Sequence, residues 1–236
     1  MSRFSRGRMQ NRLVTHKILA TNTVGDDWIC SDIHGQIDIL QSMLLEIDFD
    51  PKVDRLIFVG DLIDRGPDSL KALNFVLNSP QYYSVIGNHE LLFWASYRDS
   101  KLVNKRRGLG GEWADSLSRA EHQRLMQEIE RQFPLAISLQ TSQGVIGIVH
   151  AQSPFDSWRK WKTEPFSSEL AKKCTWDWSK SRAGGAMVSE VDVVVSGHIG
   201  RNTLIRGNQI WIDTLDTTGR PTILSACDLI GMVSQR

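Results

Sequence analysis

The stretch LIFVGDLIDRG at residues 56–66 joins four apolar residues to a cluster of two carboxylates and a guanidinium. The apolar run from Leu56 to Val59 is continuous, which is typical of a strand buried on both faces. Gly60 then allows the backbone to turn tightly, so that Asp61 follows directly at the end of the predicted strand. Ligands of open α/β sheets collect at the carboxyl ends of strands, so this stretch indicates a functional site there.

Four other polar clusters also follow predicted strands. They are Asp32-Ile33-His34-Gly35, Gly87-Asn88-His89-Glu90, Val149-His150-Ala151 and Ser196-Gly197-His198. A single histidine or one Asp-x-His pair at such a place is more often an ordinary polar turn residue. Here four of the chain's six histidines fall in these clusters, and their concentration favours a two-metal hydrolase.

The order of predicted elements indicates the fold class. Strand-like runs at 27–31, 56–59 and 83–86 alternate with helical patterns at 36–47, 69–77 and 90–97. This alternation predicts right-handed crossovers and a largely parallel sheet. Further on, the sequence predicts a helix at 117–132, a hairpin of strands 135–140 and 145–149, and strands at 191–195, 203–205, 210–212 and 222–226. Residues 153–185 give no clear pattern.

Composition limits the remaining possibilities. The chain of 236 residues has a net charge of +1 and no apolar run of membrane-spanning length, so we expect neither nucleic-acid nor membrane partners. Cys30, Cys174 and Cys227 are odd in number and far apart, which predicts a reducing compartment, the cytoplasm. We expect an N-terminal leader or edge segment at 1–26, with a short strand through Leu13-Val14 as one option, and a single domain at 27–236.

The residue types in the clusters suit dinuclear metal chemistry. Two divalent ions about 3.5–4 Å apart need a bridging carboxylate, and a water between them becomes hydroxide as its pKa falls. Mixed nitrogen and oxygen ligands favour manganese, iron or zinc over calcium. The Arg65 guanidinium is suited to binding a phosphoryl group. His89 is placed to protonate a leaving oxygen, with Asp64 holding its ring.

The succession D-x-H, G-D-x-x-D-R-G, G-N-H-E, a strand-end histidine and G-H resembles the calcineurin-like metallophosphoesterases. Within them it is similar to the phosphoprotein phosphatase branch, especially small bacterial and bacteriophage serine/threonine phosphatases, as is Gly110-Gly111-x-Trp113. The resemblance implies an α/β fold in which two mixed β-sheets pack as a sandwich flanked by helices. It also implies a metal-dependent phosphomonoesterase, a serine/threonine or dual-specificity protein phosphatase that uses a dinuclear metal centre and a metal-bound hydroxide.

The resemblance also implies roles for individual residues. The first metal would be held by Asp32, His34 and Asp61, and the second by Asp61, Asn88, His150 and His198. His89 would be the general acid supported by Asp64, and Arg65 would bind phosphate with Asn88. The cofactors would be two divalent ions, with Mn²⁺ expected and iron or zinc as alternatives, and the substrate a phosphorylated protein or a small phosphoester.

Of two departures from the family pattern, the first concerns the phosphate site. Trp176-Asp177-Trp178 stands where bacterial relatives often have W-x-R, and Asp213-Thr214-Leu215-Asp216 replaces D-T-G. The first departure removes a second phosphate-binding arginine. Arg182 is the best single substitute, because the nearby Gly184-Gly185 suggests a flexible loop, and Arg106 and Arg107 are rivals. Each of the three could also be a solvated surface charge.

Two other functions remain open. The symmetrical diadenosine tetraphosphatases share the scaffold, but they usually read G-N-H-D where this chain has Glu90. The third possible function is that of a catalytically inactive binding module. The complete set of predicted ligands argues against it, because buried Asp and His side chains without a metal would destabilise the fold.

Overall fold

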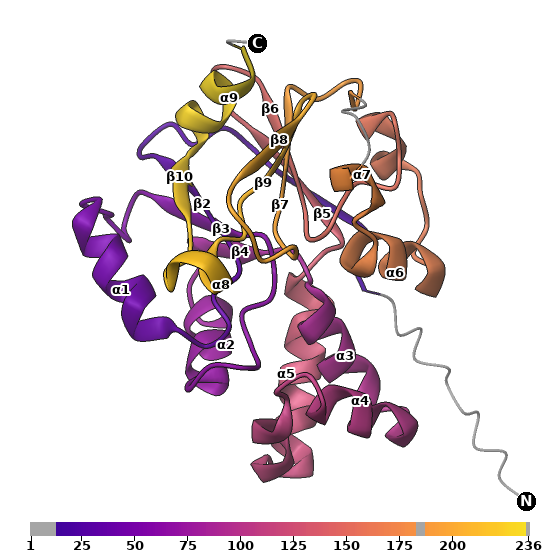
Figure 1. Ribbon diagram of the computed structural model, residues 1–236. Helices are drawn as coiled ribbons and strands as arrows, with labels where there is room; N and C mark the ends of the chain where they lie inside the picture. The colour runs from indigo at the N-terminus through magenta and orange to yellow at the C-terminus, as the bar shows by residue number, and fades with distance from the viewer. Residues whose placement is uncertain (1–12, 183–186, 235–236) are drawn as a thin grey trace, which may run out of the picture.

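The computed structural model describes residues 13–182 and 187–234, and it contains two β-sheets with helices on their outer sides (Figure 1). The six-stranded sheet has the order β1 (His16–Leu19), β5 (Ala136–Gln140), β6 (Val145–Val149), β7 (Val193–Ser196), β9 (Gln209–Trp211) and β8 (Leu204–Arg206). The four-stranded sheet has the order β10 (Ile223–Ser225), β2 (Asp27–Cys30), β3 (Arg55–Phe58) and β4 (Tyr82–Ser84). Both sheets mix parallel and antiparallel pairs.

Strand β3 shows how its sequence places it between two apolar layers. Ile57 and the following Val59 belong to the buried cluster that joins the two sheets, together with Ile148 and Val195 of the larger sheet. The alternate side chains, such as Phe58, belong to a second cluster with the apolar faces of α1 and α2. A continuous apolar run is therefore needed here, because both faces of the strand are covered.

Helices lie on several sides of the sandwich in Figure 1. They are α1 (Ile37–Glu46), α2 (Ser69–Leu77), α3 (Asn88–Ser96), α4 (Val103–Arg107), α5 (Arg119–Gln132), α6 (Ser168–Trp176), α7 (Ser179–Arg182), α8 (Leu215–Thr218) and α9 (Ala226–Ser234). Short 3₁₀ segments occupy Ser100–Leu102, Glu112–Ser116 and Trp158–Lys162. In the figure α1 and α2 lie beside the smaller sheet, α6 and α7 lie on the opposite side, and α3, α4 and α5 extend below.

The main expectations about the fold are confirmed. Two mixed sheets form a sandwich flanked by helices, and β2, β3 and β4 are parallel neighbours as the alternating pattern predicts. The predicted hairpin is also present, since β5 and β6 pair antiparallel and the Thr141 N–H donates to the Gly144 carbonyl at 2.9 Å.

Three segments differ from expectation. The N-terminal edge strand begins at His16 and not at Leu13, and it pairs in parallel with β5. Residue 226 begins helix α9 where the sequence had suggested the end of a strand. The unpatterned stretch contains α6 and the 3₁₀ segment Trp158–Lys162. The division at residue 26 stays a prediction, while residues 1–12 and the Gly184-Gly185 loop lie outside the described residues.

Gly147 in the middle of β6 leaves room for an indole. A Cβ atom built on Gly147 would lie 2.6 Å from the ring of Trp158. The Trp158 ring is buried, and its Nε1–H donates to the Ser138 hydroxyl on the neighbouring strand at 2.7 Å. The absence of a side chain at Gly147 therefore lets the Trp158 ring anchor the 3₁₀ segment against the larger sheet.

The Gly147→Ala substitution should lower the free energy of unfolding by roughly 1–3 kcal/mol, because the added methyl group overpacks the Trp158 site. The matched control is Gly231→Ala in α9, where an added Cβ meets nothing within 4 Å. The control should leave stability unchanged or raise it by up to about 1 kcal/mol, since alanine is the better helix former. Urea unfolding of both variants measures the difference, and equal midpoints would contradict this packing assignment.

Candidate metal centre

The five polar clusters meet beyond the carboxyl ends of strands from both sheets. Asp32 and His34 follow β2, Asp61 follows β3, Asn88 begins α3 after β4, His150 follows β6 and His198 follows β7. Hydrogen bonds join the loops to one another: the His34 N–H donates to the Asp61 carbonyl at 3.0 Å, and the Gly197 N–H donates to the His150 carbonyl at 2.7 Å. The His198 N–H also donates to Asp32 Oδ2 at 3.0 Å, so residues 166 positions apart are held in one place.

The Asp61 carboxylate lies at the centre of this region. Its Oδ2 atom is 3.3 Å from His150 Nε2 and 3.9 Å from the Nε2 atoms of both His34 and His89. Among the described residues, two groups have ligand atoms all within 4.8 Å of one another, namely Asp61 with His34 and His89, and Asp61 with His150 and His198. Both groups contain Asp61, and the first of them includes His89 and not Asp32.

Backbone carbonyls orient two of the imidazoles. The Nδ1 atom of His34 is 2.9 Å from the Ile63 carbonyl, and the Nδ1 atom of His150 is 2.8 Å from the Val59 carbonyl. A carbonyl can only accept, so each Nδ1 carries the proton and donates it. The hydrogen bond of each Nδ1 fixes its ring and directs Nε2 toward Asp61, as is usual for histidines that bind metal ions.

The predicted ligand Asp32 belongs to neither group, but Asp32 and Asn88 both contact members of the second. Asp32 Oδ2 accepts the His198 backbone N–H at 3.0 Å, while its buried Oδ1 has no hydrogen-bond partner among the described residues. Asn88 Oδ1 is 2.9 Å from His150 Nε2. A cation coordinated by Asn88, His150 and Asp61 would replace the proton that joins them, which is the usual exchange when metal binds histidine.

The buried carboxylates of this region favour the binding of positive charge. Burial, reinforced by the Asp213 carboxylate, raises the pKa of Asp32 well above its ordinary value. Burial opposes the charge of Asp61 as well, but His150 and His89 hold the pKa of that carboxyl well below the usual range. Burial would lower the pKa of His150, yet Asp61 raises it to about 10. Divalent cations would neutralise these buried carboxylates, so the residues fit a dinuclear centre.

His89 and Asp64 form a buried pair. His89 Nδ1 lies 2.8 Å from Asp64 Oδ2, and both side chains are completely buried. Burial alone would lower the pKa of His89, but Asp61 and the hydrogen bond that His89 donates to Asp64 raise it above the ordinary value. The other ring nitrogen, Nε2, has no hydrogen-bond partner among the described residues. The pair therefore presents the Nε2 edge of the imidazole to the Asp61 carboxylate, whose Oδ2 is 3.9 Å away.

Glu90 is a supporting residue to which sequence reasoning gave no structural role. Its buried carboxylate accepts four backbone N–H groups: Oε2 accepts from Asp61 and Gly87, and Oε1 from Leu62 and Ile63. Burial and the neighbouring Asp61 raise the pKa of Glu90 to about 7, while hydrogen bonds such as that from Gly87 favour the charged form. Glu90 thus fixes the loop that carries Asp61 to the loop that carries Asn88.

Strained backbone is concentrated in the same loops. Seven described residues other than glycine have positive φ angles, and five of them belong to the predicted site. They are His34, Asp61, Asp64, Arg65 and His198. Gly60 also has a φ of 101°, and a Cβ there would lie 2.7 Å from the Gly87 nitrogen. Such conformations persist where surrounding contacts enforce them, as Glu90 does here.

The predicted arginines have different surroundings. Arg65 lies at the rim with 48% of its side chain exposed, and its Nη1 is 3.7 Å from Asp216 Oδ2. Arg106 and Arg107 both pair with Asp115, so each of them already has a carboxylate partner. The exposed Arg182 guanidinium lies 3.4 Å from the centre of the Trp178 ring. Of the three proposed substitutes, Arg182 is the one that forms no ion pair with Asp115.

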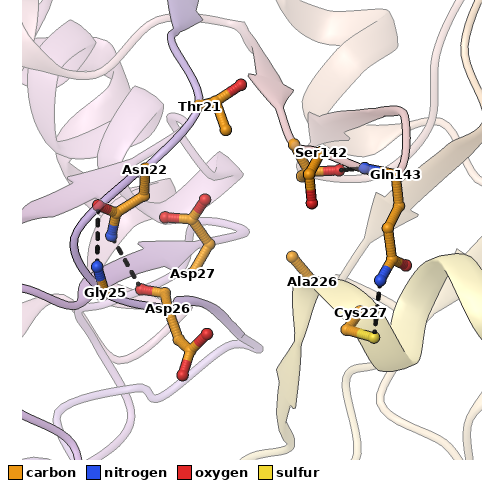
Figure 2. A pocket seen from close by; sticks show the side chains of 10 residues that line it. Thr21, Asn22, Gly25, Asp26, Asp27, Ser142, Gln143, Ala226 and Cys227 are labelled. Carbon is orange, nitrogen blue, oxygen red and sulfur yellow. Dashed lines mark hydrogen bonds between the residues drawn. The ribbon is translucent and has the colours of Figure 1, made fainter.

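A separate cavity of about 300 Å³ lies elsewhere in the fold (Figure 2). The segment from Thr21 to Asp27 forms one side, and Ser142, Gln143 and Cys227 face it from the other. Its polar groups bond to one another or to nearby residues: Gln143 Nε2 is 3.2 Å from Cys227 Sγ, and Asp27 pairs with Arg55 at 2.6 Å. None of the predicted site residues lines it.

Comparisons with known proteins agree with this geometry. The calcineurin-like phosphoesterase family profile matches residues 28–202, a range that contains all five polar clusters. A serine/threonine-protein phosphatase 2 from Salmonella typhimurium is 33% identical over 200 residues, covering 79% of this chain and 86% of the relative. A symmetrical bis(5'-nucleosyl)-tetraphosphatase from Serratia proteamaculans is 42% identical over 71 residues, covering 30% of this chain and 25% of the relative.

A solved structure extends the likeness to the fold. The crystal structure of a candidate diadenosine tetraphosphatase has a TM-score of 0.63 and 22% identity, covering 90% of this chain and 94% of the other. At this identity the match supports the shared architecture and not a shared substrate.

The Glu90→Gln substitution should lower the free energy of unfolding by roughly 2–4 kcal/mol, since one amide oxygen cannot accept four N–H groups. It should also reduce the metal content, because the loop that carries Asp61 loses its support. Glu130→Gln is the matched control, since Glu130 accepts hydrogen bonds from the side chains of Trp94 and Arg98 and not from these loops. Thermal unfolding and elemental analysis measure both effects. A Glu90→Gln protein as stable as the control would refute this role.

Proposed function

Because the chain belongs to the calcineurin-like phosphoesterase family, we propose that it is a metal-dependent phosphomonoesterase acting on phosphorylated serine and threonine side chains of proteins. The family resemblance expected from the motifs is confirmed, and the chain is a phosphoesterase, a hydrolase. The observation that carries the proposal is the Asp61 carboxylate, which two groups of imidazoles face. The Salmonella phosphatase supports the protein substrate, because it matches along 79% of the chain.

We assign the metal ligands as follows. Asp32, His34 and Asp61 hold the first ion, and Asp61, Asn88, His150 and His198 hold the second. The free Oδ1 of Asp32 and the Nε2 atoms directed by backbone carbonyls support this assignment. When bound, the two ions supply Lewis acidity and lower the pKa of a nearby water. Mn²⁺ is the proposed metal, with iron or zinc as alternatives that the same ligand types accept.

The remaining residues bind the phosphoryl group and deliver a proton. Arg65 offers two parallel N–H donors to the phosphoryl oxygens, and the Asn88 amide assists it. His89 donates its Nε2 proton to the leaving oxygen, and Asp64 holds the imidazole through Nδ1. Arg182 is the proposed second cation, supported by its exposure and by the pairing of both rival arginines with Asp115.

A symmetrical bis(5'-nucleosyl)-tetraphosphatase is the second candidate function. It is favoured by one observation, the 42% identity with the Serratia enzyme over 71 residues. That match covers 30% of this chain, whereas the phosphatase match covers 79%. Glu90 also differs from the aspartate usual in those enzymes. We therefore rank protein phosphatase activity first.

The cellular compartment is also a proposal. The described part of the chain contains no helix that is long and apolar enough to cross a membrane. All three cysteines are free, and Cys30 and Cys174 are buried. Free thiols persist in reducing compartments, which supports the cytoplasm, where phosphorylated proteins and small phosphoesters are both available.

Hydrolysis by metal-stripped protein, verified by elemental analysis, tests the proposal. We expect no turnover without added metal, and release of phosphate from a phosphoserine peptide and from p-nitrophenyl phosphate once Mn²⁺ is added. Diadenosine tetraphosphate should be split more slowly than the peptide. Symmetrical cleavage of the dinucleotide with an untouched phosphopeptide would establish the second candidate. Undiminished hydrolysis by the stripped protein would remove the metal requirement.

Substitutions at Asp61 and His89 should separate metal binding from proton transfer. Asp61→Asn should abolish metal binding and activity together, because a neutral amide bridges two cations poorly. His89→Asn should keep the metal and slow phosphoserine hydrolysis by roughly 10²–10⁴-fold, the usual contribution of a general acid. The loss should shrink for p-nitrophenyl phosphate, whose leaving group needs little protonation.

The control for the loss of an imidazole is His122→Asn, whose ring lies against Phe93 and outside the metal centre. It should keep near-normal turnover of both substrates. Equal losses on the two substrates in His89→Asn would exclude His89 as the general acid.

A further inference from the structure

Trp113 connects an inserted segment to the buried His89–Asp64 pair. It lies in the 3₁₀ segment Glu112–Ser116, between α4 and α5. Its indole Nε1–H donates to Asp64 Oδ1 at 2.6 Å. The other oxygen, Oδ2, faces His89 Nδ1 at 2.8 Å. Each oxygen of the Asp64 carboxylate therefore has its own side-chain donor, one from Trp113 and one from His89.

The Asp64 side chain depends on this donor for its orientation. It is completely buried, so bulk water does not take the place of a missing partner. The Asp64 backbone is strained, with a φ of 71°, and its N–H donates to the Ser69 hydroxyl at 2.8 Å. Without the indole, the carboxylate could rotate about its last bond and share both oxygens with His89 in more than one geometry.

Trp113 is itself held rigidly. Its ring stacks on Phe93 with centroids 5.4 Å apart and planes inclined by 10°, and Phe93 is fully buried. The neighbouring Gly110 accepts the Arg65 backbone N–H at 3.3 Å. Gly110 also lies so close that a Cβ there would be 2.6 Å from the Arg65 nitrogen. The insertion is thus packed directly against the loop that carries Asp64 and Arg65.

We propose that Trp113 is a positioning residue for proton delivery: its indole N–H fixes the Asp64 carboxylate, which in turn fixes the His89 ring with Nε2 directed toward the substrate. This inference rests on the proposed function and extends it to a residue outside the predicted site. The indole N–H of Trp113 donates to Asp64, which is not one of the proposed metal ligands. Its effect should therefore appear in proton transfer and not in metal binding.

The Trp113→Phe substitution tests the proposal, since phenylalanine keeps a ring against Phe93 but removes the donor. On a phosphoserine peptide with Mn²⁺, kcat should fall by roughly 5- to 30-fold, a part of the 10²–10⁴-fold contribution of the general acid, which itself stays in place. KM and metal content should stay unchanged. Turnover of p-nitrophenyl phosphate should fall by less than about twofold, because its leaving group departs without a proton.

The double variant supplies a sharper readout. In a His89→Asn background, Trp113→Phe should add almost no further loss, because both changes act on the same proton transfer. Trp94→Phe is the matched control, since the Trp94 indole is also partly buried and donates to a carboxylate, Glu130 Oε1, at 2.9 Å. The control should match the wild-type protein on both substrates.

A spectroscopic measurement on metal-free protein is independent of catalysis. The hydrogen-bonded Nδ1–H proton of His89 should give a sharp downfield proton resonance in the wild-type protein and in Trp94→Phe, and it should shift and broaden in Trp113→Phe, because the carboxylate then meets Nδ1 in more than one geometry. Trp113→Met, which also lacks a donor, serves as a second variant if Trp113→Phe unfolds. Equal losses on the two substrates, additive loss with His89→Asn, or an unchanged resonance would overturn the role of Trp113. A wild-type protein that hydrolyses neither substrate would instead refute the proposed function.

Discussion

The buried carboxylate of Glu90 is the contact on which the candidate centre depends. By accepting four backbone N–H groups, it fixes the loop after β3 to the start of α3. Asp61 is thereby held at a φ of 49°, with His34, His89 and His150 around its carboxylate. The two sheets provide the frame, because their strand ends bring loops from distant parts of the chain together. The buried carboxylates of Asp32 and Asp61 then favour the binding of cations, and this connects the fold to the proposed chemistry.

Much of the fold could be predicted from local patterns. Continuous apolar runs identified strands such as β3, and helical spacing gave α2 its bounds, Ser69–Leu77. The missed helix α9 did carry a local signal, because Ser225 accepts the Asp228 N–H at its start. By contrast, the 3₁₀ segment at Trp158 is stabilised by Gly147 and Ser138, which lie far away in the sequence. Contacts of that kind leave no periodic pattern for the sequence to show.

The candidate site also contains residues that the sequence identifies and residues that it does not. Its clusters were recognisable because short motifs place Asp, Asn and His directly after strands, and the chain's family membership is confirmed. The supporting residues were not recognisable as such. In the sequence, Glu90 only distinguishes this chain from the symmetrical tetraphosphatases. Trp113 belongs to a motif to which the sequence assigns no role. The contacts that suggest their roles span 28 and 49 positions, from Glu90 to Leu62 and from Trp113 to Asp64.

The central claim is that Asp61 joins two cation sites in one catalytic centre. The most direct test is an equilibrium titration of the metal-stripped protein with Mn²⁺, with phosphomonoesterase activity followed at each step. The account predicts two bound ions per chain and full activity only when both sites are filled, with neither ion bound in Asp61→Asn. A single bound ion at full activity, or two ions bound equally well by Asp61→Asn, would contradict it.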